Sequence, residues 1–410
     1  MPQNKQPKLV RISEKLQQNM QYVDELMGLE TNFDIIHRVI RLGDTDACMY
    51  LIDGFCKDEL MQKILQYLMD LKAEDFPKDA HEMSKIAIPY VEVDLDDTWE
   101  KILGALLSGV FVLLLDGYEK AVLIDARTYP TRGVEEPDKD KVLRGSKDGF
   151  VETVVFNTAL IRRRIRSTDL HMEMLNAGEN SRTDIVLCYM ESRVDPKLLT
   201  QIRERIRSIQ VDALAMNQES LAECLYQRKW YNPFPKFKYT ERPDTAAAQV
   251  LEGNLVILVD NSPSAMILPT TIFDVVEEAD DYYFPPVTGT YLRLTRFLIA
   301  LLTYFVTPTY LLLMNHRMWI PENLEFIILK EDPNVPLILQ FLLLELAIDG
   351  LRLAAVNTPN MLSTPLSVMA ALVLGEFSVE SGWFSSEVML AMAFVAIANY
   401  TQANYELGYA

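Results

Sequence analysis

The residues most able to do chemistry lie in an apolar stretch near the carboxyl end of the chain. Glu345, Asp349 and Arg352 interrupt the run VPLILQFLLLELAIDGLRLAAV at spacings of four and then three residues. On a helix these spacings place all three side chains on one face. Ionisable groups are costly in hydrocarbon, so within a membrane they usually face a bundle interior or a watery path. The alternative is a buried helix of a soluble protein, with Asp349 and Arg352 paired at its end.

A second pair of carboxylates, Glu376 and Glu380, lies four residues apart between Gly375 and Gly382. On a helix the two would share a face, and several copies of the chain would then form carboxylate rings, a device that selects cations. The alternative is that Gly375 to Gly382 is a water-exposed loop between two membrane helices. Glu345 is the stronger candidate for burial in a membrane, where it would need a compensating partner.

Four apolar runs between Leu292 and Ala398 must position these carboxylates. The first, Phe297 to Met314, has eighteen residues without a charge. That length is about the lower limit for a helix crossing a hydrocarbon core of roughly 30 Å, so we expect a membrane helix. The third and fourth runs are short, so we expect two to four crossings. Pro308 lies inside the first run, where a kink is tolerated within a bundle and could act as the hinge of a gate.

Polar and helix-breaking residues separate the second and third runs. Non-helical backbone at membrane depth survives only where protein or a water-filled cavity surrounds it. The segment is therefore either a re-entrant pore element or an ordinary short loop. The residues that mark it are Asn357, Pro359, Asn360 and Pro365.

Charge is concentrated in the amino-terminal part of the chain. The net charge is −19, and residues 291–410 hold only 5 of the 39 Lys/Arg and 10 of the 58 Asp/Glu. This acidity argues against nucleic-acid binding, which needs a basic surface. The start of the chain has no apolar core typical of a secretory signal, so we expect a cytoplasmic location for the charged part.

The four cysteines and four histidines are scattered along the chain. Their spacings match no zinc motif, disulfide scaffold or histidine-based catalytic cluster, and no nucleotide-binding loop is present. We therefore expect buried, reduced thiols, no metal, no cofactor and no enzymatic activity.

Hydrophobic patterns predict a head of two subdomains in the α/β or α+β class. The first contains a strand at Cys48 to Gly54, a helix at Lys57 to Leu71 and a hairpin from Ser108 to Ala126. The second contains helices at residues 151–166, 196–208 and 218–225, and strands at 183–190 and 254–259. The predicted organisation is an N-terminal helix in residues 1–31, of which Ser13 to Leu29 is periodic, a first subdomain in 32–131, a linker in 132–149, a second subdomain in 150–284 and a transmembrane helical domain in 285–410.

A basic run, Arg162, Arg163, Arg164 and Arg166, ends the helix predicted at residues 151–166. It could meet anionic lipid head groups or an acidic neighbouring subunit. A solvated helix end, favoured by the helix dipole, explains it equally well. Shortly before it, residues 144–146 are either an anion-holding nest or a simple turn.

Five ordered segments resemble the A subunits of GerA-type spore germination proteins. They are RGSKDGFVE (144–152), N-x-x-LIRRRIR (157–166), PFPKFKYTERPD (233–244), EGNLVILVDNSP (252–263) and DDYYF (280–284). The resemblance runs from about residue 140 to the end, and the tail is similar to the sporulation-stage-V AF branch of the family.

The resemblance implies a cytoplasmic two-subdomain head and a bundle of membrane helices in the inner membrane of bacterial endospores. It also implies contact with membrane lipids, homo-oligomerisation into a ring that can conduct ions, and a second integral-membrane germination subunit as partner. The chain departs from germinant-receptor A subunits at LELAIDGLRLAAVNTP and GEFSVESGW, which weakens a direct role in a nutrient receptor. Resembling proteins continue past NYELGYA, so we expect further sequence beyond residue 410.

Two functions remain after these observations. One is a subunit of a membrane channel or signal relay, in which the carboxylates tune ion passage. The other is a membrane-anchored scaffold or regulator that binds partner germination proteins and conducts nothing.

Overall fold

The computed structural model describes residues 10–56, 58–128, 146–226, 235–271, 273–274, 283–330, 332–357, 368 and 370–400. The chain divides into two compact units. The head unit comprises Met1–Asn232 and Lys236–Thr270, and the helical unit comprises Pro233–Pro235 and Thr271–Ala410.

The first part of the head unit is a five-stranded antiparallel sheet in the order β1-β2-β4-β5-β3. Its strands are β1 (Ile35–Leu42), β2 (Thr45–Ile52), β3 (Val93–Asp96), β4 (Phe111–Leu115) and β5 (Ala121–Ile124). The predicted hairpin is confirmed as β4 and β5, which pair Phe111 with Ile124. The sequence patterns missed β1, because four consecutive residues of this edge strand, 36–39, are exposed and break the alternation.

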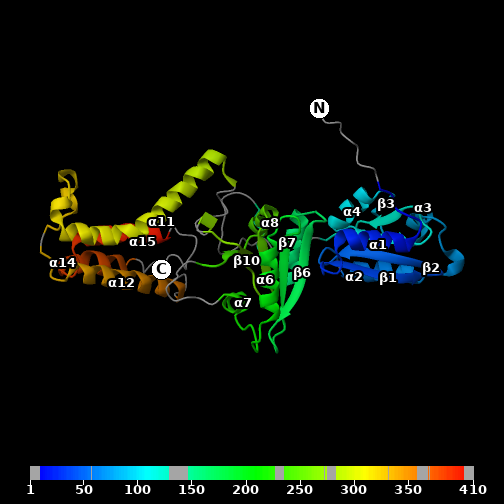
Figure 1. The fold of residues 1–410 in the computed structure, drawn as a ribbon, viewed down its shortest axis with the longest axis horizontal. Coiled ribbons are helices and arrows are strands. Elements are labelled where there is room, and N and C mark those ends of the chain that lie inside the picture. Colours follow the sequence, from blue (N-terminus) through cyan, green and yellow to red (C-terminus); the bar gives the residue numbers. More distant parts are fainter. Residues whose placement is uncertain are drawn as a thin grey trace. The chain divides into compact units, whose positions relative to one another are not determined.

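Helices cover both faces of this sheet (Figure 1). α1 (Leu16–Met27) and α4 (Trp99–Leu107) share a core with Tyr50, whereas α2 (Asp58–Met69) and the helical turns α3 (Ala80–Glu82) and Met83–Ala87 share a core with Met49. Successive side chains of a strand point to opposite faces, which is why neighbouring residues of β2 enter different cores. The helices predicted from Ser13 and from Lys57 are both confirmed.

The second part of the head unit is another five-stranded antiparallel sheet, in the order β6-β7-β9-β10-β8. Its strands are β6 (Leu170–Ala177), β7 (Thr183–Met190), β8 (Lys238–Thr240), β9 (Leu255–Val259) and β10 (Ala265–Leu268). α5 (Val154–Arg164) and α8 (Pro243–Glu252) pack on one face, and α6 (Pro196–Arg207) and α7 (Gln218–Leu225) on the other. The three helices and two strands predicted in this part are confirmed. Both sheets are antiparallel, which corresponds to α+β rather than α/β.

The two parts of the head unit repeat one plan. In each, a helix is followed by a hairpin, helical segments, a short strand, a helix and a second hairpin, and the strand orders correspond position by position. Residues 10–128 are called the first repeat and residues 146–271 the second repeat. The sequence interpretation missed this duplication, although VFVLLLDGYEKAVLID (110–125) and NLVILVDNSPSAMILP (254–269) align without a gap.

The same side chains hold the start of each repeat. In the first, Asn19 donates to the Ser13 carbonyl at 2.6 Å and accepts from the Ser13 N–H at 2.8 Å. In the second, Asn157 makes the same two bonds to Val151 at 2.6 and 2.8 Å. Both amides are buried. A buried amide that both donates to and accepts from one backbone residue fixes a single backbone path, so the two copies share local geometry as well as topology.

A carboxylate after the fourth strand of each repeat completes the match. Asp116 Oδ1 accepts from the Leu16 N–H at 2.9 Å, and Asp260 Oδ1 accepts from the Val154 N–H at 3.1 Å. Each carboxylate therefore binds the first turn of the helix that opens its own repeat, where free N–H groups attract negative charge.

In the part of the helical unit that the structure describes, three long helices pack together, α11 (Pro286–Asn315), α12 (Leu337–Asn357) and α15 (Ser386–Tyr400) (Figure 1). Their shared apolar cluster includes Tyr310, Phe341 and Val388. Shorter helical segments are Arg317–Trp319, Glu322–Ile327, Ala371–Phe377 and α14 (Ser378–Glu380). Among the described residues, α11 is the single helix long and apolar enough to cross a membrane, and the shorter apolar helix Ser386–Asn399 adds no second full span.

Candidate functional site

The charged residues of the second apolar run lie on one helix, as predicted. α12 contains Glu345, Asp349 and Arg352, and Arg352 Nη1 lies 4.0 Å from Asp349 Oδ1. The predicted pairing of Asp349 with Arg352 is therefore present, at the outer limit of an ion pair. Glu345 is exposed, and no basic side chain of the described residues lies within 4.0 Å of its carboxylate.

Glu345 lies on a flank of α12. Phe341 and Leu344 are buried against the other helices, whereas Leu342 and Leu346 are exposed and apolar. Since successive residues of an α-helix are separated by a little over a quarter turn, Glu345 lies between the packed face and the exposed apolar face. Among the described residues the carboxylate therefore has no basic side chain within ion-pair distance.

Glu376 and Glu380 lie in a helical segment. Residues Ala371–Phe377 form a π-helical turn and Ser378–Glu380 continue as α-helix, and the chain turns at Gly382, which has a φ of +71°. The alternative of a loop from Gly375 to Gly382 is wrong for residues 375–380, because the backbone hydrogen bonds continue to Ser381. Both carboxylates are exposed.

Pro308 lies inside α11, which continues on both sides of it. The ribbon of α11 changes direction part-way along its length (Figure 1), and a hinge at Pro308 stays a prediction. Asn357 is the last residue of α12. Pro359, Asn360 and Pro365 lie outside the described residues, so a re-entrant segment there also stays a prediction.

Polar side chains join α12 to the start of α15. Gln340 is buried, and its Oε1 accepts from the Ser385 N–H at 2.9 Å while its Nε2 donates to the Val335 carbonyl at 2.8 Å. Nearby, Asn334 donates to the Gly382 carbonyl at 3.2 Å. A satisfied polar group in an apolar environment fixes one arrangement of its neighbours, so these bonds set the register of α12 against α15.

Arg162 of the basic run is buried and not available to lipid or solvent. Its guanidinium is 0% exposed and donates to both oxygens of Asp34, at 2.8 and 3.1 Å, and to the Leu170 carbonyl at 3.1 Å. Both interpretations of the basic run are therefore wrong for this residue. The reason is that the last turn of α5 lies at the junction of the two repeats, which the sequence pattern of the helix did not reveal.

Arg164 is also engaged within the chain, at a place where three of the resembling segments meet. It pairs with Asp148 at 2.5 Å and donates to Ser146 Oγ at 3.2 Å. Arg242, fully buried, donates to the Ser146 carbonyl at 2.7 Å and pairs with Asp244 at 2.7 Å. Each guanidinium already has a carboxylate, so Ser146 belongs to a polar cluster within the chain. Residues 144 and 145 lie outside the described residues, so the choice between an anion-holding nest and a simple turn stays open.

Arg163 and Arg166 are exposed. Contact of these two residues with lipid or with an acidic subunit stays a prediction.

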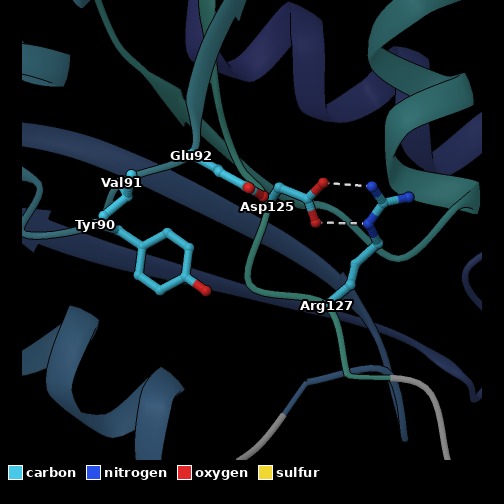
Figure 2. Close-up of a pocket in the computed structure, with 5 residues that line it drawn as sticks. All are labelled: Tyr90, Val91, Glu92, Asp125 and Arg127. Carbon is cyan, nitrogen blue, oxygen red and sulfur yellow. Dashed lines mark hydrogen bonds and ion pairs between the residues drawn. The ribbon is translucent and has the colours of Figure 1, made fainter.

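An open pocket of about 530 Å³ lies where β3 begins and β5 ends. Its lining residues are Tyr90, Val91, Glu92, Asp125 and Arg127. Figure 2 shows the Arg127 guanidinium directed at the Asp125 carboxylate, and Arg127 Nε donates to Asp125 Oδ1 at 2.5 Å. This hydrogen bond lowers the pKa of Asp125. None of the residues singled out in the sequence lines this pocket.

The cysteines are not arranged for catalysis. Burial raises the pKa of the Cys48 thiol to about 11 and also raises the pKa of Cys188, so neither is a thiolate at neutral pH. The expectation of buried thiols is confirmed for Cys48 and Cys188, but Cys56 is half-buried and Cys224 is exposed. No group of three or more His, Cys, Asp or Glu within the described ranges is placed to hold a metal ion.

Sequence reasoning missed Asp34, the partner of Arg162. Asp34 is 128 residues away in the sequence and lies just before a strand that was itself missed. The internal repeat is the signal that could have found the junction, because it places the start of both hairpins in register.

Comparison with known proteins agrees with the resemblance. The family profile of the Bacillus/Clostridium GerA spore germination protein matches residues 21–410. Stage V sporulation protein AF of Bacillus subtilis (strain 168) is 38% identical over 412 residues, which cover 100% of this chain and 83% of the relative. Spore germination protein KA of the same organism is 27% identical, over 97% of this chain and 74% of the relative.

A solved structure supports the fold of the head unit. It is the crystal structure of the N-terminal domain of the A subunit of the Bacillus megaterium spore germinant receptor GerK3, with a TM-score of 0.50 and 27% identity. The match covers 65% of this chain and 98% of that structure. Together with the family match over nearly the whole length, these similarities establish that this chain belongs to the GerA family of spore germination proteins.

Proposed function

We propose that this chain is an integral membrane subunit of a GerA-type spore germination complex, which oligomerises and forms or gates an ion path in the inner membrane of the endospore. In this proposal α11 and further helices cross the membrane, the head unit is cytoplasmic, and a second integral-membrane germination subunit and membrane lipids are the partners. The chain is not an enzyme and holds no cofactor.

The observation that carries the proposal is the position of Glu345. A carboxylate on an apolar helix is costly in contact with lipid, and Glu345 has no charged partner among the described residues. A neighbouring protein surface or a water-filled path would remove that cost. A ring of subunits with the flank of α12 turned inward supplies both.

Glu376 and Glu380 support the same proposal. They are exposed on a helical segment at a spacing of four residues, and rings of carboxylates favour cations over anions. The proposal therefore assigns the path to cations.

The test is ion flux from liposomes that contain the purified full chain with its candidate membrane partner. Glu345→Gln should reduce cation flux by about tenfold or more, because one charge is removed from every subunit of the ring. Glu322→Gln is the matched control, since Glu322 is an exposed carboxylate in the segment between α11 and α12, and it should leave the flux unchanged. Equal flux in the wild type and both variants would contradict an ion path along α12.

The alternative function is a membrane-anchored scaffold or regulator that binds partner germination proteins without conducting ions. Its support is that one helix of the described residues, α11, is long and apolar enough to span a membrane. The same liposomes separate the two functions. A scaffold predicts no flux above that of protein-free liposomes, together with retained binding of the partner subunit.

A further inference from the structure

Two different surfaces join the repeats within one chain. The first repeat contributes residues 28–34 and the turn at Gly54, called the loop surface. The second repeat contributes the outer side of α5 and the free edge of β6, called the edge surface. Met172 of β6 donates its N–H to Asn32 Oδ1 at 2.6 Å, and its carbonyl accepts from the Phe33 N–H at 3.2 Å.

The junction is closely packed. A Cβ added to Gly54 would lie 3.2 Å from the Cβ of Ala159, on α5. The buried pair of Arg162 and Asp34 completes the contact. The main features of the junction are therefore a small residue on the loop surface, a small residue on the helix and an ion pair between the two surfaces.

Because the repeats share one plan, each must possess a version of both surfaces. The first repeat has an edge surface made by α1 and β1, and the second repeat has a loop surface made by residues 166–169 and 191–193. Neither version is used in the junction between the repeats. Such a head-to-tail contact is heterologous, so repeating it between copies produces a ring or a filament.

The edge surface of the first repeat is open. His37 and Met172 are both the third residue of their strands, and the hydrogen bonds from Asp53 to Asp34 and from Glu191 to Asp169 set the same register. This register directs the N–H and carbonyl of His37 outward, as it does those of Met172. Met172 is covered, whereas Ile36 and Val39, on either side of His37, are 38% and 52% exposed.

We propose that the head units of neighbouring copies pack through these two unused surfaces, with the loop surface of the second repeat on the edge surface of the first repeat of the next copy. The inference rests on the proposed oligomer and names its interface. An exposed strand edge with apolar side chains is a template for pairing with another chain, and the junction within the chain shows which shape this edge accepts.

The counterparts of the packed residues both lie on the surface, where Gln21 donates to Glu25 and Ser192 donates to Asp169. Gln21 lies two residues after Asn19, as Ala159 lies two residues after Asn157, so Gln21 takes the place of Ala159. Ser192 takes the place of Gly54. Gly54 follows Asp53, whose N–H donates to the Asp34 carbonyl, and Ser192 follows Glu191, whose N–H donates to the Asp169 carbonyl. Gln21 and Ser192 are both exposed.

The charges differ from those of the junction within the chain. Asp24 takes the place of Arg162 and Asp169 takes the place of Asp34, so two carboxylates meet where the chain has an ion pair. Arg166, which is exposed beside Asp169, supplies a cation. The contact between copies is consequently weaker than the internal junction, and it depends on the high effective concentration that a shared membrane provides.

The test is disulfide formation between full-length copies in membrane vesicles, in a Cys56→Ser/Cys224→Ser background. Gln21→Cys and Ser192→Cys are made in separate copies and then co-expressed, because counterparts of Gly54 and Ala159 lie within disulfide range. The mixture should give crosslinked dimers, and a chain with both substitutions should give a ladder of larger species. Met216→Cys with Ser192→Cys is the matched control pair, since Met216 is exposed outside both surfaces, and it should give none.

Adding Asp24→Arg to Gln21→Cys should raise the yield at least about threefold, because it restores an arginine opposite Asp169. Crosslinking of either single variant alone would show a symmetric contact and overturn the proposal. A ring-sized oligomeric mass without the mixed disulfide would overturn this interface and leave the proposed oligomer intact. A monomeric mass without the disulfide would overturn both.

Discussion

The head unit and the helical unit treat their charged residues in opposite ways. In the head unit Arg162 and Asp34 are buried, and the guanidinium also bonds backbone carbonyls, so the pair is satisfied within the chain. In the helical unit Glu345 is exposed on the flank of an apolar helix, and no basic side chain of the described residues lies within 4.0 Å of its carboxylate. The buried ion pair of the head unit is therefore satisfied within the chain, whereas Glu345 has no charged partner among the described residues.

The difference follows from where each charge is desolvated. Burying two charges within a protein is costly, and the cost is recovered only when the geometry and the remaining hydrogen bonds are good. The junction of the repeats provides both, because two rigid sheets hold the partners in place. On α12, Glu345 lies between the packed face and the exposed apolar face, and the described residues bring no basic side chain to it.

Arg162→Met should have the largest effect. It leaves Asp34 buried without its partner, which costs about 3–5 kcal/mol of stability. Hydrogen exchange of the β7 amides in the full-length protein would measure the loss. Arg163→Met is the matched control, since Arg163 is exposed on the same turn, and it should change stability by less than about 0.5 kcal/mol. Equal losses of stability in the two variants would show that the buried ion pair adds nothing beyond an exposed arginine. The contrast between the head unit and the helical unit would then disappear.

Asn157→Ala should come next. It removes two bonds to Val151 and leaves backbone groups unsatisfied, at a cost of about 1–3 kcal/mol. Asn19→Ala should cost a similar amount, because Asn19 makes the same bonds in the first repeat. The comparison is made by hydrogen exchange of β7 and β2 amides respectively. A loss in one variant and none in the other would show that the repeats are alike in topology but not in energetics.

A smaller effect is expected from pH at the junction of the repeats. Burial lowers the pKa of His171 below its ordinary value of 6.5, and the charge of Arg162 also lowers it. The unfolded chain then binds a proton before the folded one, so stability falls as the pH drops through 6.5. His171→Gln should flatten this dependence in hydrogen exchange between pH 7 and pH 5. An unchanged pH profile would exclude His171 as its source.

The smallest effect on stability is expected for Glu345→Gln. Its carboxylate has no partner among the described residues, so the variant should change the stability of the helical unit by less than about 0.5 kcal/mol. The measurement is hydrogen exchange of α12 amides in detergent. A large destabilisation would show that Glu345 is already satisfied within one chain, and the contrast with Arg162 would disappear.

Most elements of the head unit could be predicted because local patterns define them. The helices from Val151 and Pro196 and the strand Thr183–Met190 follow from the spacing of apolar residues. Edge strands such as β1 could not, since exposure on one side disrupts the alternation. On α12 the sequence placed three charges on one face correctly, because that depends only on helical spacing.

The sequence by itself determined what depends on neighbours along the chain: the helical runs, the hairpin of β4 and β5, the spacing of the carboxylates and the motifs of the GerA family. Only the tertiary structure decided what depends on distant residues. It paired Arg162 with Asp34 across 128 positions, gathered Arg164, Arg242 and Ser146 into one cluster, and revealed two copies of one fold. The physical reason is that burial and partner choice are properties of packing, and a basic run reads the same in sequence whether its guanidinium ends in water or in the centre of a junction.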